Sequence, residues 1–125
     1  SLYVMEHGYD ARGSRPVWGA GDYLWKVEPG KWYGFPDFMG GIPVSVTNVP
    51  KHADPKPLLA SYPNEVPKPA ATLGVHSGAS GLDFSRSATF AHVGEAFVAE
   101  FGDQAPVVGK VMSPVGYKIS RVNVN

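Results

Sequence analysis

The chain has no cysteine, no net charge and no long hydrophobic run, and each absence removes a class of protein. Without cysteine there is no disulfide framework, no thiolate zinc site and no cysteine nucleophile. Eleven Lys and Arg balance eleven Asp and Glu, so no overall field attracts a nucleic acid or an anionic membrane. No apolar run approaches the roughly 20 residues that cross a bilayer. We therefore expect neither a nucleic-acid nor a membrane partner, and the compartment stays open because no signal peptide is recognisable.

Glycine and proline are abundant instead, with 15 Gly and 12 Pro among the 125 residues. Short apolar or alternating stretches recur between them, whereas sustained helical spacing is absent, and this pattern is typical of β-strands. Residues 95–101 could also form a helix, but the alternation of Phe97, Ala99 and Phe101 favours a strand. We predict an all-β fold of antiparallel strands over residues 2–5, 23–27, 42–47, 71–75, 81–84, 95–101, 107–112 and 117–124.

The length predicts one domain, residues 1–125, because a chain of this size holds a single modest core. Six prolines between residues 49 and 69 remove backbone donors repeatedly and predict a long surface loop that is ordered or of polyproline II type. An apolar strand that ends in glycine occurs over residues 3–8 and again over 97–102. Evenly spaced short strands suit a sandwich, a barrel or a propeller. Two units, residues 1–60 and 61–125, would suit two propeller blades, but this similarity alone does not establish a repeat.

The densest polar cluster follows the first expected strand, where loops often carry binding sites. Arg12 and Arg15 each offer a planar fork of donors for a carboxylate or phosphate, and Gly13 allows a ligand to approach the backbone. Two such forks predict a site for a small polyanion. The alternative is a solvated loop in which Arg12 pairs with Asp10 and Arg15 packs on Trp18.

His7 and His76 are candidate general bases, although neither has a second histidine at metal-ligand spacing. The alternative for both is a hydrogen-bonded structural role, unless they converge on one pocket. The string at 76–81, with two glycines and two serines, can present backbone amides to an anion. It lacks the lysine of a phosphate-binding loop, and it does not match the G-x-S-x-G pattern of a serine hydrolase.

Aromatic side chains gather at residues 32–36, in the sequence WYGFP. They could stack on a planar cofactor or a sugar. The favoured alternative is a packed corner between strands, because side chains of this size dominate small β cores.

Six strings in order resemble the C-terminal part of the soluble pyrroloquinoline quinone (PQQ)-dependent glucose/sorbosone dehydrogenase family. They are LYVMEHG at 2–8, RGSRPV at 12–17, DYLWKV at 22–27, WYGFPD at 32–37, HSGASGLDF at 76–84 and PVGYKISRV at 114–122. The resemblance implies a six-bladed β-propeller with PQQ and calcium at its mouth. It also implies oxidation of a sugar or sugar aldehyde by hydride transfer to the quinone, in a periplasmic or secreted protein.

The resemblance assigns roles to individual residues. The backbone carbonyls of Gly8 and Tyr9 would bind calcium, and Ser77 would lie next to the cofactor. The family's catalytic histidine base comes from an earlier blade, which has no counterpart here. If the chain forms a dehydrogenase module, Arg12 and Arg15 would hold the cofactor carboxylates, and His7 or His76 would be the only local base. Two departures stand out: Tyr9 replaces a proline, and Asp103 and Gln104 stand where glucose-type members place a cofactor lysine.

A chain of 125 residues makes about two blades, whose open edges need covering. We expect homo-oligomerisation, as a trimer that closes a ring or as a dimer, or completion by a longer chain. Two functions follow. The first is a dehydrogenase module that is active when the full site is assembled. The second is a non-catalytic binding or assembly module that has lost the base and the cofactor lysine.

Overall fold

The computed structural model describes residues 1–8, 19–44, 56–63, 65–66, 68–102 and 115–124. Within these ranges the chain contains strands and no helix, and so no helix of the length and apolarity that a membrane crossing requires. The strands are β1 (Leu2–Glu6), β2 (Gly21–Val27), β3 (Phe38–Met39), β4 (Ile42–Pro43), β5 (Ala71–Val75), β6 (Ala79–Phe84), β7 (Ala96–Glu100) and β8 (Lys118–Val122). The all-β prediction is confirmed, including the choice of strand over helix at β7. The strand expected at 107–112 lies outside the described residues, as do residues 45–47 of the third.

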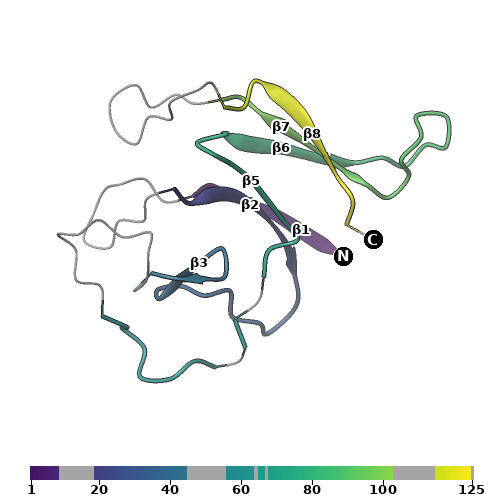
Figure 1. Ribbon diagram of the computed structural model, residues 1–125. Helices are drawn as coiled ribbons and strands as arrows, with labels where there is room; N and C mark the ends of the chain where they lie inside the picture. Colours follow the sequence, from purple (N-terminus) through teal and green to yellow (C-terminus); the bar gives the residue numbers. More distant parts are fainter. Residues whose placement is uncertain (9–18, 45–55, 64, 67, 103–114, 125) are drawn as a thin grey trace.

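The strands form three small antiparallel sheets (Figure 1). The first sheet has the order β1-β2-β5, the second sheet has the order β6-β7-β8, and β3 pairs with β4 in a short hairpin. No propeller is seen among the described strands. β5 joins β2 in the first sheet, with Leu24 opposite Ala71, so the chain passes from the first sheet to the second between Val75 and Ala79.

The first sheet has a different neighbour on each face. Residues opposite each other in a ladder point to the same side, so Glu6 and Tyr23 share one face with Val4 and Trp25. The main core lies between this face and the β3–β4 hairpin, and its buried members are Ala20, Tyr23, Trp25, Met39 and Val44.

The opposite face of the first sheet meets the second sheet through the edge strands β1 and β6. The ring of Tyr3 in β1 lies 5.0 Å from the ring of Phe84 in β6. In the second sheet, Ala96 and Val98 are fully buried, whereas Ile119 of β8 is 71% exposed. Figure 1 shows the resulting order, with the hairpin, the first sheet and the second sheet as successive layers.

The described part of the proline-rich segment contains no strand and packs on the β3–β4 hairpin. The buried carboxylate of Asp37 accepts the backbone amides of Leu58 at 2.8 Å and Leu59 at 2.9 Å. The ring of Tyr62 stacks on Trp32, with 5.2 Å between ring centroids. The surface-loop prediction holds for these described residues, which pack as an ordered cover on the hairpin.

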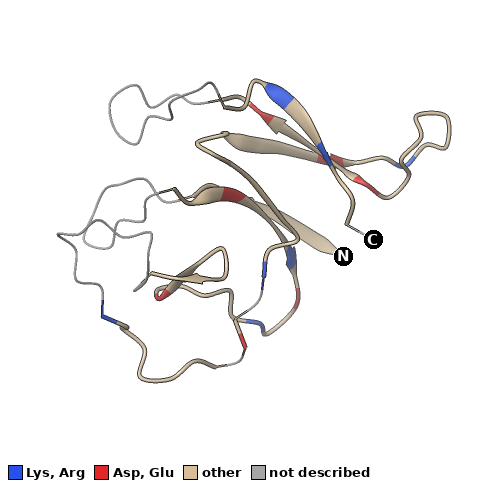
Figure 2. Ribbon diagram, in the orientation of Figure 1, with Lys and Arg blue, Asp and Glu red and all other residues tan. Residues whose placement is uncertain are grey.

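Charged side chains of both signs are scattered over the described strands and turns (Figure 2). Two exposed pairs bracket short turns, Glu28 with Lys31 and Asp83 with Arg86. The Lys31 ammonium lowers the pKa of the Glu28 carboxyl, and a hydrogen bond from the Phe84 amide lowers that of Asp83, aided by Arg86. These pairs support turns and lie apart from the buried carboxylates.

Candidate functional site

One buried carboxylate ties the two large sheets together. Asp22 of β2 is only 3% exposed. Its Oδ1 accepts the backbone amide of Gly8 at 2.9 Å, and its Oδ2 accepts the Ser77 hydroxyl at 3.0 Å and the Ala79 amide at 2.9 Å. We call Asp22 and these three partners the Asp22 junction. It joins the end of β1, the start of β2 and the start of β6.

The Ser77 side of the junction is a tight turn between β5 and β6. The Ser77 amide donates to the Gly74 carbonyl at 3.1 Å, and His76 takes a left-handed conformation with φ of 58°. The Ser77 carbonyl in turn accepts the Gly102 amide at 2.9 Å. One hydroxyl and one backbone amide of this string, from Ser77 and Ala79, bind the carboxylate of the protein's own Asp22.

His7 lies beside the junction and is held by it. Its Nε2 is 3.0 Å from the carbonyl oxygen of Ala79, and its ring centroid is 6.3 Å from that of Phe101. A carbonyl oxygen only accepts, so Nε2 carries the hydrogen and Nδ1 of the neutral ring carries the lone pair. His7 therefore has the geometry of a hydrogen-bonded wall residue with one nitrogen left for a proton.

The junction holds two of the residues singled out in the sequence, Gly8 and Ser77, and a third, His7, lies beside it. His76 precedes Ser77 in the turn. The other three candidates, Tyr9, Arg12 and Arg15, lie outside the described residues.

Sequence reasoning missed Asp22, the residue that organises the group. A signal was present in the sequence. Asp22 directly precedes an apolar strand that is expected to be buried, and a buried carboxylate needs several hydrogen-bond donors. The glycine- and serine-rich string at 76–81 supplies them.

The described residues do not by themselves make a calcium site. Calcium takes six to eight oxygen ligands. Both oxygens of Asp22 already accept hydrogen bonds, and the described ranges hold no cluster of three His, Asp or Glu side chains suited to a metal. Most ligands of a calcium ion bound next to Gly8 would therefore have to come from elsewhere.

The aromatic corner at residues 32–36 is divided between core and surface. Tyr33 packs edge-on against Trp25, with 5.4 Å between ring centroids. Its hydroxyl donates to the Lys26 carbonyl at 3.2 Å. Phe35, in contrast, is 73% exposed. The packed-corner alternative describes Tyr33, and the stacking hypothesis stays open for Phe35.

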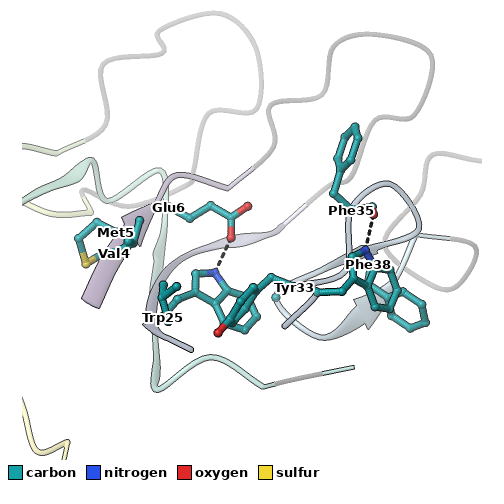
Figure 3. Close-up of a pocket in the computed structure, with 10 residues that line it drawn as sticks. Val4, Met5, Glu6, Trp25, Tyr33, Phe35 and Phe38 are labelled. Carbon is teal, nitrogen blue, oxygen red and sulfur yellow. Dashed lines mark hydrogen bonds between the residues drawn. The ribbon is translucent and has the colours of Figure 1, made fainter. Parts of the chain in front are cut away.

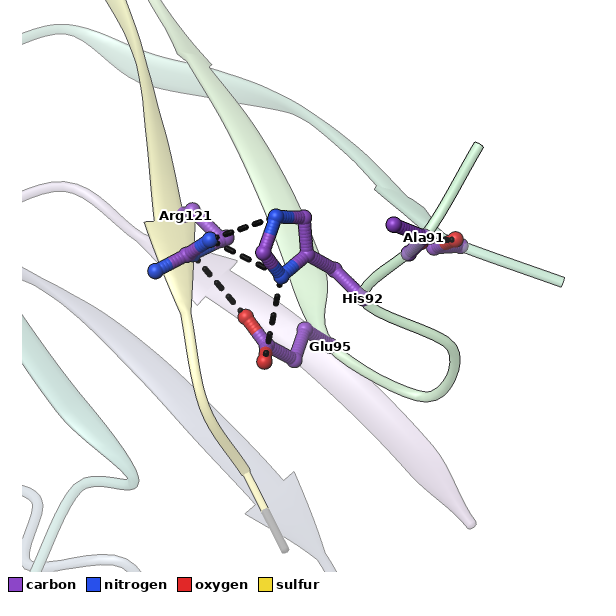
Figure 4. Close-up of polar contacts among 5 residues, drawn as sticks. Ala91, His92, Glu95 and Arg121 are labelled. Carbon is purple, nitrogen blue, oxygen red and sulfur yellow. Dashed lines mark hydrogen bonds and ion pairs between the residues drawn. The ribbon is translucent and has the colours of Figure 1, made fainter. Parts of the chain in front are cut away.

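Two glutamates at the two ends of β7 have opposite surroundings. Glu95, just before the strand, pairs with Arg121 at 3.0 Å, and Arg121 also contacts the ring of His92 (Figure 4). Glu100, at the end of the strand, is 3% exposed. Its Oε1 accepts the Ser120 hydroxyl, while no described group donates to its buried Oε2.

The two glutamates should therefore respond oppositely to the same substitution. Glu100→Gln keeps an acceptor for Ser120 and removes a buried charge, so we expect the free energy of unfolding to rise by about 1 kcal/mol. Glu95→Gln removes an ion pair at a partly exposed site, so it should lower the free energy of unfolding by less than about 1 kcal/mol. Urea denaturation at neutral pH measures both. A loss of stability in Glu100→Gln as large as that in Glu95→Gln would contradict the assignment.

The chain matches no protein-family model, no curated protein and no solved structure. What it does must be inferred from its own chemistry, and the Asp22 junction is the feature that gathers the candidate residues in one place.

Proposed function

We propose that the chain is a two-blade segment of a β-propeller of the PQQ-dependent glucose/sorbosone dehydrogenase type, active when further blades complete its site. The observation that carries the proposal is the Asp22 junction. A single buried carboxylate draws together Gly8 and Ser77, with His7 beside them, from opposite halves of the chain. These are residues that the family resemblance places near the cofactor and its calcium.

The packing of the two large sheets supports the same proposal. Neighbouring blades of a propeller are small antiparallel sheets that pack face against face around an axis. Here the two sheets meet along their edge strands β1 and β6, and both the Tyr3–Phe84 ring contact and the His7–Ala79 hydrogen bond cross that boundary. An axis beside β1 and β6 would place the junction at one end of it.

The residues of the junction then have distinct roles. The Gly8 amide is held by Asp22, next to the carbonyl that is proposed to bind calcium. His7 holds its Nε2 on the Ala79 carbonyl and offers Nδ1 to a proton. PQQ, when bound, would supply the hydride acceptor. Its carboxylates and the calcium need further partners, for which Tyr9, Arg12, Arg15 and neighbouring blades are the proposed sources.

A second candidate is a non-catalytic assembly module, and a separate observation favours it. Large apolar side chains are exposed on the edge strands and next to them: Leu2 of β1 at 61%, Ile119 of β8 at 71% and Tyr117 at 64%. Edge strands with exposed apolar residues invite pairing with another sheet. Such a surface requires a partner whether or not any cofactor binds.

The test measures solution mass by multi-angle light scattering, with and without PQQ and calcium. For the dehydrogenase module we expect the mass of a trimer. PQQ and calcium should stabilise this trimer against dissociation. We also expect a shifted quinone absorbance and a melting temperature raised by several degrees at ligand concentrations about 100-fold above Kd. Sugar oxidation is then assayed on that oligomer.

The other outcomes separate the two candidates. A dimer or trimer that ignores PQQ and calcium would support the assembly module and overturn the dehydrogenase. A monomer whose mass and stability do not change with PQQ and calcium would overturn each of them.

Ser77→Ala should weaken any PQQ response, whereas Ser80→Ala, at the exposed serine in β6, serves as the matched control.

A further inference from the structure

A cavity of about 420 Å³ opens between the first sheet and the β3–β4 hairpin (Figure 3). Side chains alternate along β2, so Trp25, which lines the cavity, and Asp22 point to opposite faces. This volume lies within the range of small-molecule sites. Five aromatic rings and one carboxylate dominate its wall: Trp25, Trp32, Tyr33, Phe35, Phe38 and Glu6. The cavity belongs to a part of the fold that the proposed dehydrogenase site does not use.

The polar atoms of these aromatic side chains are engaged within the protein. The Trp25 indole donates to Glu6 Oε2 at 2.5 Å, and the Trp32 indole donates to the Phe35 carbonyl at 2.6 Å. The Tyr33 hydroxyl donates to a carbonyl and accepts the Glu28 amide at 2.7 Å. The rings therefore offer a ligand their faces and edges, and their side-chain donors are already used.

Glu6 is the one carboxylate among the residues of the cavity wall. Its negative charge acts on the neighbouring Tyr23. Burial raises the pKa of the Tyr23 phenol, and the negative charges of Glu6 and Asp22 raise this pKa further. The ammonium of Lys31, at the turn after β2, is paired with Glu28. Among the described residues, the wall thus combines electron-rich rings with a negative charge and contributes no positive one.

We propose that this cavity binds an organic cation, an ammonium group carried on a small apolar body. Ring faces attract such a cation through their quadrupoles, and Glu6 supplies the opposite charge. A sugar fits less well, because its hydroxyls also need donors and the aromatic side-chain donors here are occupied. A neutral apolar ligand would fill the space without using Glu6.

The test titrates the protein, without PQQ or calcium, with choline and with its neutral isostere 3,3-dimethylbutan-1-ol. Tryptophan fluorescence reports occupancy, and calorimetry measures the affinity. We expect choline to bind at least about fivefold more tightly than the isostere. Equal affinities would overturn the proposal, and so would saturable binding of glucose in preference to choline. Failure to bind PQQ would leave this result unchanged, because the cavity and the Asp22 junction have no residue in common.

Three variants locate the binding. Glu6→Gln keeps an acceptor for the Trp25 indole and removes the charge, so choline affinity should fall by about tenfold while the isostere is unaffected. Phe35→Ala removes a side chain that is 73% exposed and contributes little to the core, and should weaken choline binding about two- to fivefold. Phe90→Ala, at a phenylalanine 63% exposed outside this cavity, is the matched control and should change nothing. Unchanged choline affinity in both Glu6→Gln and Phe35→Ala would refute the site.

Discussion

Asp22→Ala should lower the free energy of unfolding by about 3–5 kcal/mol, a large share of the roughly 5–15 kcal/mol that holds a domain of this size together. The substitution leaves the Gly8 amide, the Ser77 hydroxyl and the Ala79 amide without their acceptor. Hydrogen bonds to a charged group contribute about 1.5–3 kcal/mol each, and a buried donor left unpaired adds a penalty. The loss should therefore exceed that of an ordinary surface substitution several times over.

Urea denaturation followed by tryptophan fluorescence measures this loss. Asp83→Ala is the matched control, because Asp83 is an exposed aspartate that binds a backbone amide and an arginine at the surface. Its midpoint should stay close to that of the unchanged protein. Similar midpoints for the two variants would mean that Asp22 does not join the sheets. Asp22→Asn should fall between them, since an amide has one acceptor oxygen where the carboxylate has two.

Gly40→Ala should be the second large loss, at about 3 kcal/mol, the sum of a conformational cost and a packing cost. Gly40 has φ of 58°, and a Cβ at this position would overlap the ring of Tyr23. Tyr23 is 2% exposed and belongs to the core beneath the hairpin, so its ring has little room to move. A left-handed alanine costs about 1–2 kcal/mol, and overpacking of a core costs about 1–3 kcal/mol.

Gly30→Ala separates these two contributions. Gly30 also has a positive φ, 73°, but a Cβ there meets nothing within 4 Å. It should cost only about 1 kcal/mol, the conformational part alone. Thermal unfolding of the two variants gives the difference directly. If Gly30→Ala proved as damaging as Gly40→Ala, the packing of the hairpin on Tyr23 would not be the cause.

The sequence predicted most strands because their pattern is local. In β7 the alternation of Phe97 and Ala99 was enough to favour a strand, and it is one. β3 has two residues, which is too short for any periodicity to show, whereas β4 lies at the start of the strand expected at 42–47. The pairing of β2 with β5 could not be predicted either, because strand partners are chosen by packing across the whole fold rather than by neighbouring residues.

The candidate site was predicted in part for the same reason. His7 and Ser77 were singled out from strings that end a strand or enter a turn, and Gly8 through the family resemblance. Their convergence depends on Asp22, whose role is visible only once β2 and the 76–81 string lie side by side. The aromatic cavity also depends on a distant contact, because Glu6 of β1 meets rings from β2 and the hairpin. The propeller stays a prediction.

The order of the first sheet bears on how the chain folds. β2 and β5 are neighbours in the sheet, yet residues 28–70 run between them in the chain. Closing this long connection costs conformational entropy before the hydrogen bonds between β2 and β5 are gained. The connection between β6 and β7 is only residues 85–95, so its closure costs less entropy. Until the β3–β4 hairpin within residues 28–70 has packed on the first sheet, the aromatic side chains on that face of β2 are accessible to other chains. A partly folded molecule is therefore most prone to aggregate through Tyr23 and Trp25.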